Sequence, residues 1–280
     1  MALQGKVYLL DGLVIPTIVE KANLEELKDL ALRDDDLWIV SYPKSGSTWT
    51  QYIVHLIHNG GIDDGMRIND AVPWLEAGAH DCSISVKDLI PPRAFKSHMP
   101  YERMPCGLPS ATPCKYIYVA RNPKDVATSF FYHYRAYRIP GMEWKEFIKS
   151  FLEGRLAFGN YFDHVLGWWS HKDDKNVLFI KYEDMKRDLV TVITQIATFM
   201  GYPNIPQETV REISQKVAFD KMRDNSTVNQ SWTERHQGTP DFFRKGDIGD
   251  WRTHFSPEDS KHFDGIYQNQ LRPAGLEFQF

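Results

Sequence analysis

The chain is poor in cysteine and has no long hydrophobic run. Its three cysteines, Cys82, Cys106 and Cys114, form no CxxC pair and no metal-ligand spacing, so we expect neither a disulfide framework nor a metal site. No stretch approaches the roughly 18 apolar residues of a membrane span. The N-terminal segment has no charged region followed by an apolar run. We therefore expect a cytoplasmic protein with free thiols and no membrane association.

An excess of positive charge is also missing. The 280 residues include 33 Lys and Arg against 37 Asp and Glu, a net charge of -4 at pH 7, which argues against nucleic acid as a partner. A single anionic ligand held by a few local cations remains compatible with this balance. With 42% hydrophobic residues and no repeat or linker, the chain is expected to form a single domain over residues 1–280.

The hydrophobic pattern predicts a parallel α/β fold. Short apolar runs rich in β-branched and aromatic residues predict buried strands at residues 37–41, 94–97, 116–120 and 177–182. Helical patterns precede, separate and follow these runs. Such alternation is typical of a central parallel sheet flanked by helices, in which ligands bind at the carboxyl ends of the strands.

Several residues mark where the helices begin and end. Asn23 and Glu26 have the spacing of a capping box at the first helix. Asn122 is placed to cap a helix over 123–134 that starts with Pro123, and Gly201 stands where a helix over 189–200 would end. A further helix is predicted at 49–57, directly after the first strand.

A short turn with one glycine joins the first strand to its helix, and it carries the features of an anion site. Free backbone N–H groups and the helix dipole at such a start favour an anion. Hydroxyl groups and one lysine add donors; the turn reads Tyr42-Pro43-Lys44-Ser45-Gly46-Ser47-Thr48-Trp49. The GxxxxGK[ST] spacing is absent, and taken alone such a turn is more often a plain helix cap.

Charged residues also follow the next two strands. Arg121 ends the third strand and precedes Ser129 by about two helical turns, so it could bind an anion or pair with Asp125. Lys96 and His98 lie on one face of the second strand, which brings a cation and a titratable base together. A lone histidine is more often structural than catalytic.

A glycine-rich loop near the C-terminus adds two adjacent cations. The loop carries Arg244 and Lys245 between aromatic residues and reads Phe242-Phe243-Arg244-Lys245-Gly246-Asp247-Ile248-Gly249-Asp250-Trp251. It suits closure over an anion, although a solvated loop is the simpler interpretation.

Together, the turn at 42–49, the segment from Arg121 to Ser129 and the loop ending at Trp251 resemble the cytosolic sulfotransferase family. The order and spacing of the three blocks carry the resemblance, which spans residues 37–251. It implies an enzyme with a P-loop-like strand–loop–helix. The enzyme would transfer a sulfuryl group from 3′-phosphoadenosine 5′-phosphosulfate (PAPS) to a hydroxyl or amine of a small acceptor. The product would be 3′-phosphoadenosine 5′-phosphate (PAP), and no metal would be needed.

The resemblance also implies a set of donor-binding residues. The phosphosulfate loop would comprise Lys44, Ser45, Gly46, Ser47, Thr48 and Trp49, with Trp49 stacking on adenine. The 3′-phosphate would be bound by Arg121, Ser129, Arg244, Lys245 and Gly246, next to Phe242 and Phe243. Tyr182 would reach the adenine edge, and the base would be covered by Val217, Ala218, Phe219 and Met222.

The catalytic roles follow from the same resemblance. His98 would be the base that removes the acceptor proton. Lys44 would stabilise the charge that grows on the leaving oxygen, and Lys96 would stabilise the sulfuryl oxygens. Ser129 would restrain Lys44 until an acceptor binds, which would limit hydrolysis of the donor.

The acceptor pocket is less well defined by the sequence. Besides Lys96 and His98, its predicted wall residues are Trp74, Phe131, Tyr132 and His133, each of which could equally be a core residue. These aromatic side chains favour a flat, apolar acceptor such as a phenol, and a steroid or an amine is also compatible with them.

Two departures from the family pattern stand out. Ser47 replaces the more usual threonine and keeps the hydroxyl. The family's dimer segment, KxxxTVxxxE, corresponds here to residues 252–261, where Arg252 and Lys261 replace Lys and Glu and Ser256-Pro257 replaces Thr-Val. A homodimer remains possible, but the usual contact is altered.

Three other functions fit the sequence less well. A nucleotide or nucleoside kinase also binds phosphates at strand–turn–helix sites, but the Walker spacing and a strand-end aspartate for Mg²⁺ are missing. A nucleotide-binding member without turnover is disfavoured by the presence of Lys44, Lys96, His98 and Ser129. A Golgi glycan sulfotransferase would carry a membrane anchor and disulfides.

Overall fold

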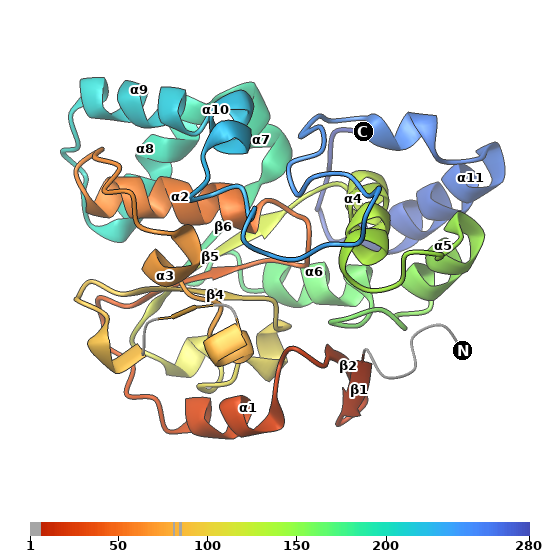
Figure 1. The fold of residues 1–280 in the computed structure, drawn as a ribbon, viewed down its shortest axis with the longest axis horizontal. Helices are drawn as coiled ribbons and strands as arrows, with labels where there is room; N and C mark the ends of the chain where they lie inside the picture. Colours follow the sequence, from red (N-terminus) through yellow and green to blue (C-terminus); the bar gives the residue numbers. More distant parts are fainter. Residues whose placement is uncertain (1–6, 81, 84–85) are drawn as a thin grey trace.

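A four-stranded parallel sheet lies at the centre of the molecule (Figure 1). The computed structural model describes residues 7–80, 82–83 and 86–280. The strands pair in the order β4-β3-β5-β6, and every pair in this sheet is parallel. Their bounds are β3 Leu37–Val40, β4 Ala94–Ser97, β5 Lys115–Ala120 and β6 Val177–Lys181. The predicted α/β fold is confirmed, with strand ends within one residue of those predicted.

Helices cover both faces of this sheet, and a small antiparallel hairpin lies apart from it (Figure 1). The hairpin consists of β1 Val7–Leu10 and β2 Leu13–Pro16. The helices are α1 Lys21–Lys28, α2 Ser47–His58, α3 Ile68–Ala71, α4 Pro123–Tyr137, α5 Trp144–Leu152, α6 Tyr161–Trp169, α7 Tyr182–Arg187, α8 Leu189–Met200, α9 Gln207–Lys216, α10 Phe219–Asp224 and α11 Pro257–Ile266. Among the described residues, none of the helices has the length and apolarity needed to cross a membrane.

Alternate residues of the strands face two separate hydrophobic cores. In β3, Trp38 and Val40 belong to the core shared with α4, α5, α6 and α11. Leu37 and Ile39 belong to the opposite core, shared with α2, α8 and α9. Because successive strand side chains point to opposite faces, a continuous apolar strand is the sequence signature of a sheet covered on both sides.

The predicted helix signals are partly confirmed. The Asn122 side chain accepts a hydrogen bond from the Asp125 backbone N–H at 2.8 Å, so it caps α4, and Gly201 ends α8 with φ 101°. The capping-box prediction for Asn23 was wrong. Helix α1 begins at Lys21 after Glu20, and the Asn23 amide instead packs against Gly78 of the neighbouring segment. Helix α4 extends three residues beyond the predicted end, to Tyr137.

The turn after β3 places backbone groups where a ligand can reach them. Gly46 precedes α2 with φ 114°, a conformation that favours glycine, and Lys44 also has a positive φ of 71°. A Cβ atom added at Gly46 would lie 2.9 Å from the Tyr182 ring, which stands after β6. Glycine is therefore required here both for the backbone conformation and for the close approach of Tyr182.

The substitution Gly46→Ala is expected to destabilise the protein more than an alanine at an unobstructed glycine. Backbone strain costs about 1–2 kcal/mol, and the contact with Tyr182 adds about 1 kcal/mol or more. Gly60→Ala is the matched control, because Gly60 also has a positive φ, of 60°, but has nothing within 4 Å of the added Cβ. Urea unfolding measures both free energies. Equal losses for the two variants would contradict the role of Tyr182.

Candidate active site

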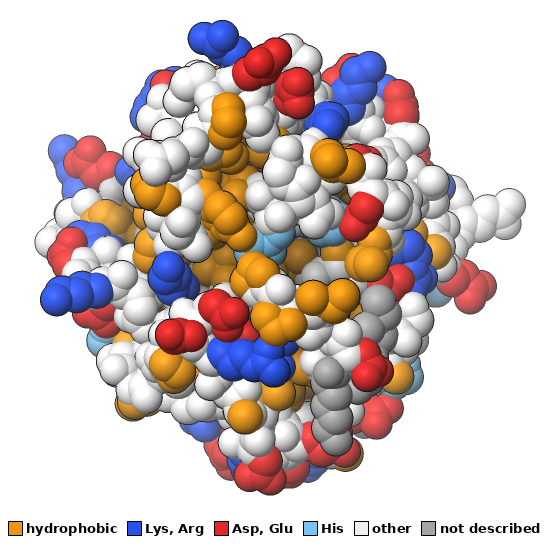
Figure 2. All heavy atoms as spheres, turned by 90° about the vertical axis from the view of Figure 1, so that its left-hand side faces the viewer, with side chains coloured by type: hydrophobic (Ala, Val, Ile, Leu, Met, Phe, Trp, Pro, Cys, Tyr) orange, Lys and Arg blue, Asp and Glu red, His pale blue; other side chains and the backbone are white. Residues whose placement is uncertain are grey.

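A cavity of about 220 Å³ lies over the carboxyl ends of the parallel strands. Its lining includes Lys44 after β3, His98 after β4, Arg121 after β5 and Tyr182 after β6. Figure 2 shows a hollow in which hydrophobic and histidine side chains are visible, with charged side chains around its rim. Residues from four separate strand ends therefore meet in one place, as the parallel topology requires.

The start of α2 provides an anion site at the floor of the cavity. The helix begins without a side-chain cap, and Gly46, Ser47, Thr48 and Trp49 line the cavity. Its first backbone N–H groups are therefore available to an anionic ligand, and the helix dipole favours one. Ser45, which was predicted to take part, is fully buried and does not line the cavity.

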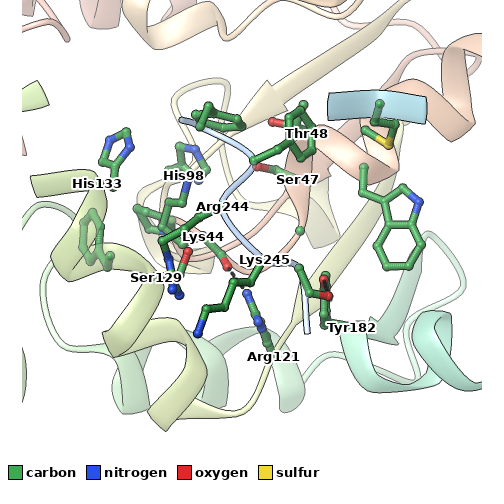
Figure 3. A pocket seen from close by; sticks show the side chains of 18 of the residues that line it. Lys44, Ser47, Thr48, His98, Arg121, Ser129, His133, Tyr182, Arg244 and Lys245 are labelled. Atoms are coloured by element: carbon green, nitrogen blue, oxygen red, sulfur yellow. Dashed lines mark hydrogen bonds between the residues drawn. The ribbon is translucent and has the colours of Figure 1, made fainter. Parts of the chain in front are cut away.

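Cations from three parts of the chain gather beside this helix start (Figure 3). Lys44, Arg121, Arg244 and Lys245 all line the cavity. Burial, reinforced by the positive charges of Lys96, Arg121 and Arg244, lowers the pKa of Lys44 to about 7. The Lys44 ammonium lies over the Phe242 ring, 3.8 Å from its centroid. This concentration of positive charge favours a polyanionic ligand.

The C-terminal loop that carries two of these cations is fixed to α4. The Asp125 carboxylate accepts hydrogen bonds from the backbone N–H groups of Gly249 at 2.8 Å and Trp251 at 3.1 Å. Asp125 therefore anchors the loop and does not pair with Arg121, the alternative raised by the sequence. Arg121 instead donates to the Asp247 carbonyl at 2.8 Å.

Asp250 is the internal counter-ion of this loop. Its carboxylate pairs with both Arg244 and Lys245, and these partners hold the pKa of Asp250 below its usual value against the opposing effect of burial. Because one carboxylate neutralises only one of the two cations, the group keeps a net positive charge that can bind a phosphate.

His98 is oriented by the backbone of the neighbouring strand. Its Nδ1 lies 2.8 Å from the Ser41 carbonyl oxygen, and because a carbonyl only accepts, Nδ1 carries the proton. Burial, together with the charge of Lys96, lowers the pKa of His98 well below its ordinary value. The imidazole is therefore neutral at pH 7, and its Nε2 lone pair is available to take a proton.

A second histidine fixes the backbone at His98. The His164 Nε2 lies 3.0 Å from the His98 carbonyl oxygen, and the His164 Nδ1 lies 2.8 Å from the Tyr118 hydroxyl. Since the carbonyl accepts, Nε2 of His164 is protonated and Nδ1 accepts from Tyr118. His98 is thus held through both its side chain and its main chain.

Aromatic residues form a wall around His98. Trp74 lies alongside β4 through a bridge to Lys96, and its ring centroid is 5.3 Å from that of His98. The Phe158 ring lies 5.4 Å from His98, and the Lys96 ammonium lies 5.0 Å from the Trp74 ring. This end of the cavity therefore combines a flat apolar surface with the neutral imidazole.

Another aromatic group lies on the far side of the helix start. Trp49 and Tyr182 are in edge contact at 5.3 Å, and the Tyr182 hydroxyl donates to the Gly246 carbonyl at 2.6 Å. Val217, Phe219, Met222 and Phe243 complete the cavity lining here, whereas the predicted Ala218 is not part of it. Such a surface suits a planar base next to the cations.

Two predicted acceptor residues lie elsewhere. Phe131 is buried against Trp144 and Phe147, with ring centroids 5.1 and 5.5 Å away, and does not line the cavity. The prediction for Phe131 fails because it lies about 200° around α4 from Ser129, whereas His133 lies about 40° from it. Tyr132 also lies outside this cavity, and its ring centroid is 4.3 Å from the Arg244 guanidinium.

The remaining predicted site residues do line the cavity, and several further residues join them. Trp74, Lys96, Ser129 and His133 are in the lining, although within the described residues no hydrogen bond joins Ser129 to Lys44. The lining residues that the sequence did not indicate include Pro16, Tyr134, Arg138, Ala157 and Phe158. They come from the hairpin, the end of α4 and a turn before α6, and none of these segments carries a motif.

Comparisons with known proteins agree with this geometry. The family profile described as "Sulfotransferase domain" matches residues 34–275. Sulfotransferase 1C2 of Rattus norvegicus is 36% identical over 268 residues, which cover 91% of this chain and 90% of that protein. Amine sulfotransferase of Oryctolagus cuniculus is 36% identical over 274 residues, which cover 94% of this chain and 89% of that protein.

A solved structure extends the likeness to three dimensions. The crystal structure of mouse sulfotransferase SULT7A1 complexed with PAP superimposes with a TM-score of 0.76 at 31% identity, covering 96% of this chain and 95% of that one. The shared fold, the sequence identity and the family profile lead to one conclusion. This chain belongs to the sulfotransferase family.

Proposed function

We propose that this sulfotransferase transfers the sulfuryl group of PAPS to the hydroxyl of a small aromatic acceptor, with His98 as the base. One observation carries the assignment of the base. The Nδ1 proton of His98 is committed to the Ser41 carbonyl, which leaves Nε2 unprotonated between the cation cluster and the aromatic wall. A neutral imidazole so placed can accept the proton of an acceptor hydroxyl.

The donor is PAPS, and the cavity has a complementary group for each part of it. The helix start at Gly46, Ser47 and Thr48 suits the 5′-phosphosulfate. Arg121 and the Arg244-Lys245 pair suit the 3′-phosphate. The Asp250 carboxylate now pairs with Arg244 and Lys245, where the phosphate would bind. Trp49, Tyr182 and Phe219 suit the adenine.

The reaction requires that negative charge be stabilised on the leaving group. As the acceptor oxygen bonds to sulfur, the bond from sulfur to the bridging phosphate oxygen breaks, and charge grows on that oxygen. Lys44, beside the helix start, is suited to stabilise it, and Lys96 beside Trp74 is suited to the sulfuryl oxygens. His98 takes the acceptor proton as the new bond forms.

The wall around His98 supports a flat acceptor. Trp74 and Phe158 present aromatic surface next to the base. A hydroxyl is preferred to a protonated amine, because Lys96 and Arg138 would repel a second cation here. A phenol meets both conditions.

We further propose that the chain acts as a single domain in the cytosol. The segment that corresponds to the family's usual dimer contact, residues 252–261, leads into α11. Ser256 and Asp259 form a capping box there, and the Arg252 guanidinium donates to the Phe280 carbonyl at 2.7 Å. Because this segment differs from the usual pattern and is engaged within its own chain, we propose no homodimer through it.

Replacing His98 by alanine should abolish transfer while preserving donor binding. The loss of a general base lowers kcat by about 10²–10⁴. The rate is measured as PAP formation from PAPS with 4-ethylphenol, and the Kd for PAP by fluorescence. His262→Ala is the control, because His262 is exposed on α11. Unchanged turnover in His98→Ala would remove His98 from the mechanism.

Binding of PAP should be accompanied by proton uptake at pH 8. In the free protein the pKa of Lys44 is about 7, so the amine is mostly neutral at pH 8. A bound polyanion raises this pKa, and Lys44 takes up a proton. The affinity for PAP should therefore fall as pH rises above 7.

Calorimetry at pH 8 in Tris and in HEPES, whose ionisation enthalpies differ, measures this uptake. Lys44→Met should remove most of it. If the wild-type protein releases protons or shows no buffer dependence, Lys44 does not bind the donor in the way described.

A further inference from the structure

A guanidinium at the acceptor end of the cavity lacks a counter-ion in the part of the chain that the structure describes. Arg138 follows the last residue of α4 and lines the cavity together with Tyr134, Ala157 and Phe158. Within residues 7–80, 82–83 and 86–280, its guanidinium forms no ion pair and no hydrogen bond. Burial lowers the pKa of Arg138, which marks its position as unfavourable for an isolated charge.

Tyr134, one turn before Arg138 on α4, cannot neutralise this charge. The Tyr134 hydroxyl accepts a hydrogen bond from the Ala157 backbone N–H at 2.9 Å, and burial raises the pKa of Tyr134, so it remains uncharged. Arg138 lines the same cavity as Ala157 and Phe158, and the Phe158 ring lies 5.4 Å from the His98 ring. Arg138 therefore belongs to the acceptor wall.

The donor does not account for Arg138. The cations assigned to PAPS lie around the start of α2 and the first turns of α4, near Ser129. Arg138 is nine residues beyond Ser129, or about 13 Å along the helix axis. The phosphates of PAPS are expected to be bound by Lys44, Arg121 and the Arg244-Lys245 pair, which leaves Arg138 for another anionic group.

A second polar group without a partner lies on the same side. Nδ1 of His133 is buried and has no hydrogen-bond partner among the described residues. Burial, together with the charges of Lys44 and Arg138, lowers the pKa of His133 well below its ordinary value. His133 lies near His98 in Figure 3 and, being neutral, offers a hydrogen bond and no charge.

We infer that the preferred acceptor is a phenol that also carries a carboxylate, with its hydroxyl at His98 and its carboxylate paired with the Arg138 guanidinium. This inference rests on the proposed function and adds the substrate class. A guanidinium pairs bidentately with a carboxylate, and His133 supplies a further hydrogen bond to the bound acid. The product is the aryl sulfate of the acid, formed with PAP as the phenolic proton passes to His98.

The test acceptor needs a phenol and a carboxylate joined by a short flexible chain, so that the carboxylate can reach the Arg138 guanidinium while the hydroxyl stays at His98. We therefore choose 3-(4-hydroxyphenyl)propanoate as the test acceptor. Its primary amide is the matched neutral acceptor, because it differs in charge and hardly in shape.

The test compares kcat/KM for the acid and the amide with PAPS. The wild-type enzyme should prefer the acid at least tenfold, and Arg138→Met should reduce this ratio about tenfold or more. Arg138→Glu should invert the preference, towards the cationic phenol tyramine. Arg135→Met is the control, since Arg135 lies one turn earlier on α4 and donates to the Pro140 carbonyl outside the cavity. Its acid-to-amide ratio should equal that of the wild type.

The outcomes separate this inference from the proposed function. If the wild-type enzyme sulfates the amide as well as the acid, or if Arg138→Met keeps the acid preference, the inference is overturned while phenol sulfation stands. If neither phenol is sulfated although PAP binds, the phenol acceptor is wrong and the inference fails with it. Measuring the Kd for PAP in each variant confirms that the donor site is intact.

Discussion

The structure depends on a concentration of positive charge at one edge of a parallel sheet. Lys44, Arg121 and Arg244 come from segments far apart in the sequence, and Asp250 pairs with Arg244 within the loop. The effect is visible in Lys44, whose pKa falls to about 7 because burial and its cationic neighbours disfavour its charge. The negative charges of a polyanionic donor counteract the repulsion between these cations, so the arrangement of the site favours donor binding.

The same edge of the sheet orients His98 and keeps its imidazole neutral. Strands β3 and β4 pair in parallel, so the Ser41 carbonyl lies beside His98, which follows β4, and accepts a hydrogen bond from its Nδ1–H. Burial then keeps the imidazole neutral. Neither effect requires an acidic partner, and a carboxylate at this place would compete with the donor for the cations. The arrangement thus combines a neutral base with a cationic donor site.

The sequence predicted the fold well, because the strands and helices are carried by local patterns, and most residues expected at the donor site line one cavity. Each apolar strand, the turn at Gly46 and the loop at Arg244 is a continuous stretch of the sequence. The match to the sulfotransferase family profile favours sulfuryl transfer over the kinase alternative. The acceptor wall was predicted poorly. Phe131 was placed there although the rotation of α4 turns it into the core, and Phe158 and Arg138 were missed because no motif marks them.

The most direct test of the account is a crystal structure of the chain with PAP. We expect the 5′-phosphate on the backbone N–H groups of Gly46, Ser47 and Thr48, and the 3′-phosphate between Arg121 and the Arg244-Lys245 pair. The His98 Nε2 should then face the space beyond the 5′-phosphate. A nucleotide bound with its phosphates away from Lys44 and Arg121, or a His98 ring turned so that Nε2 bonds to Ser41, would contradict it.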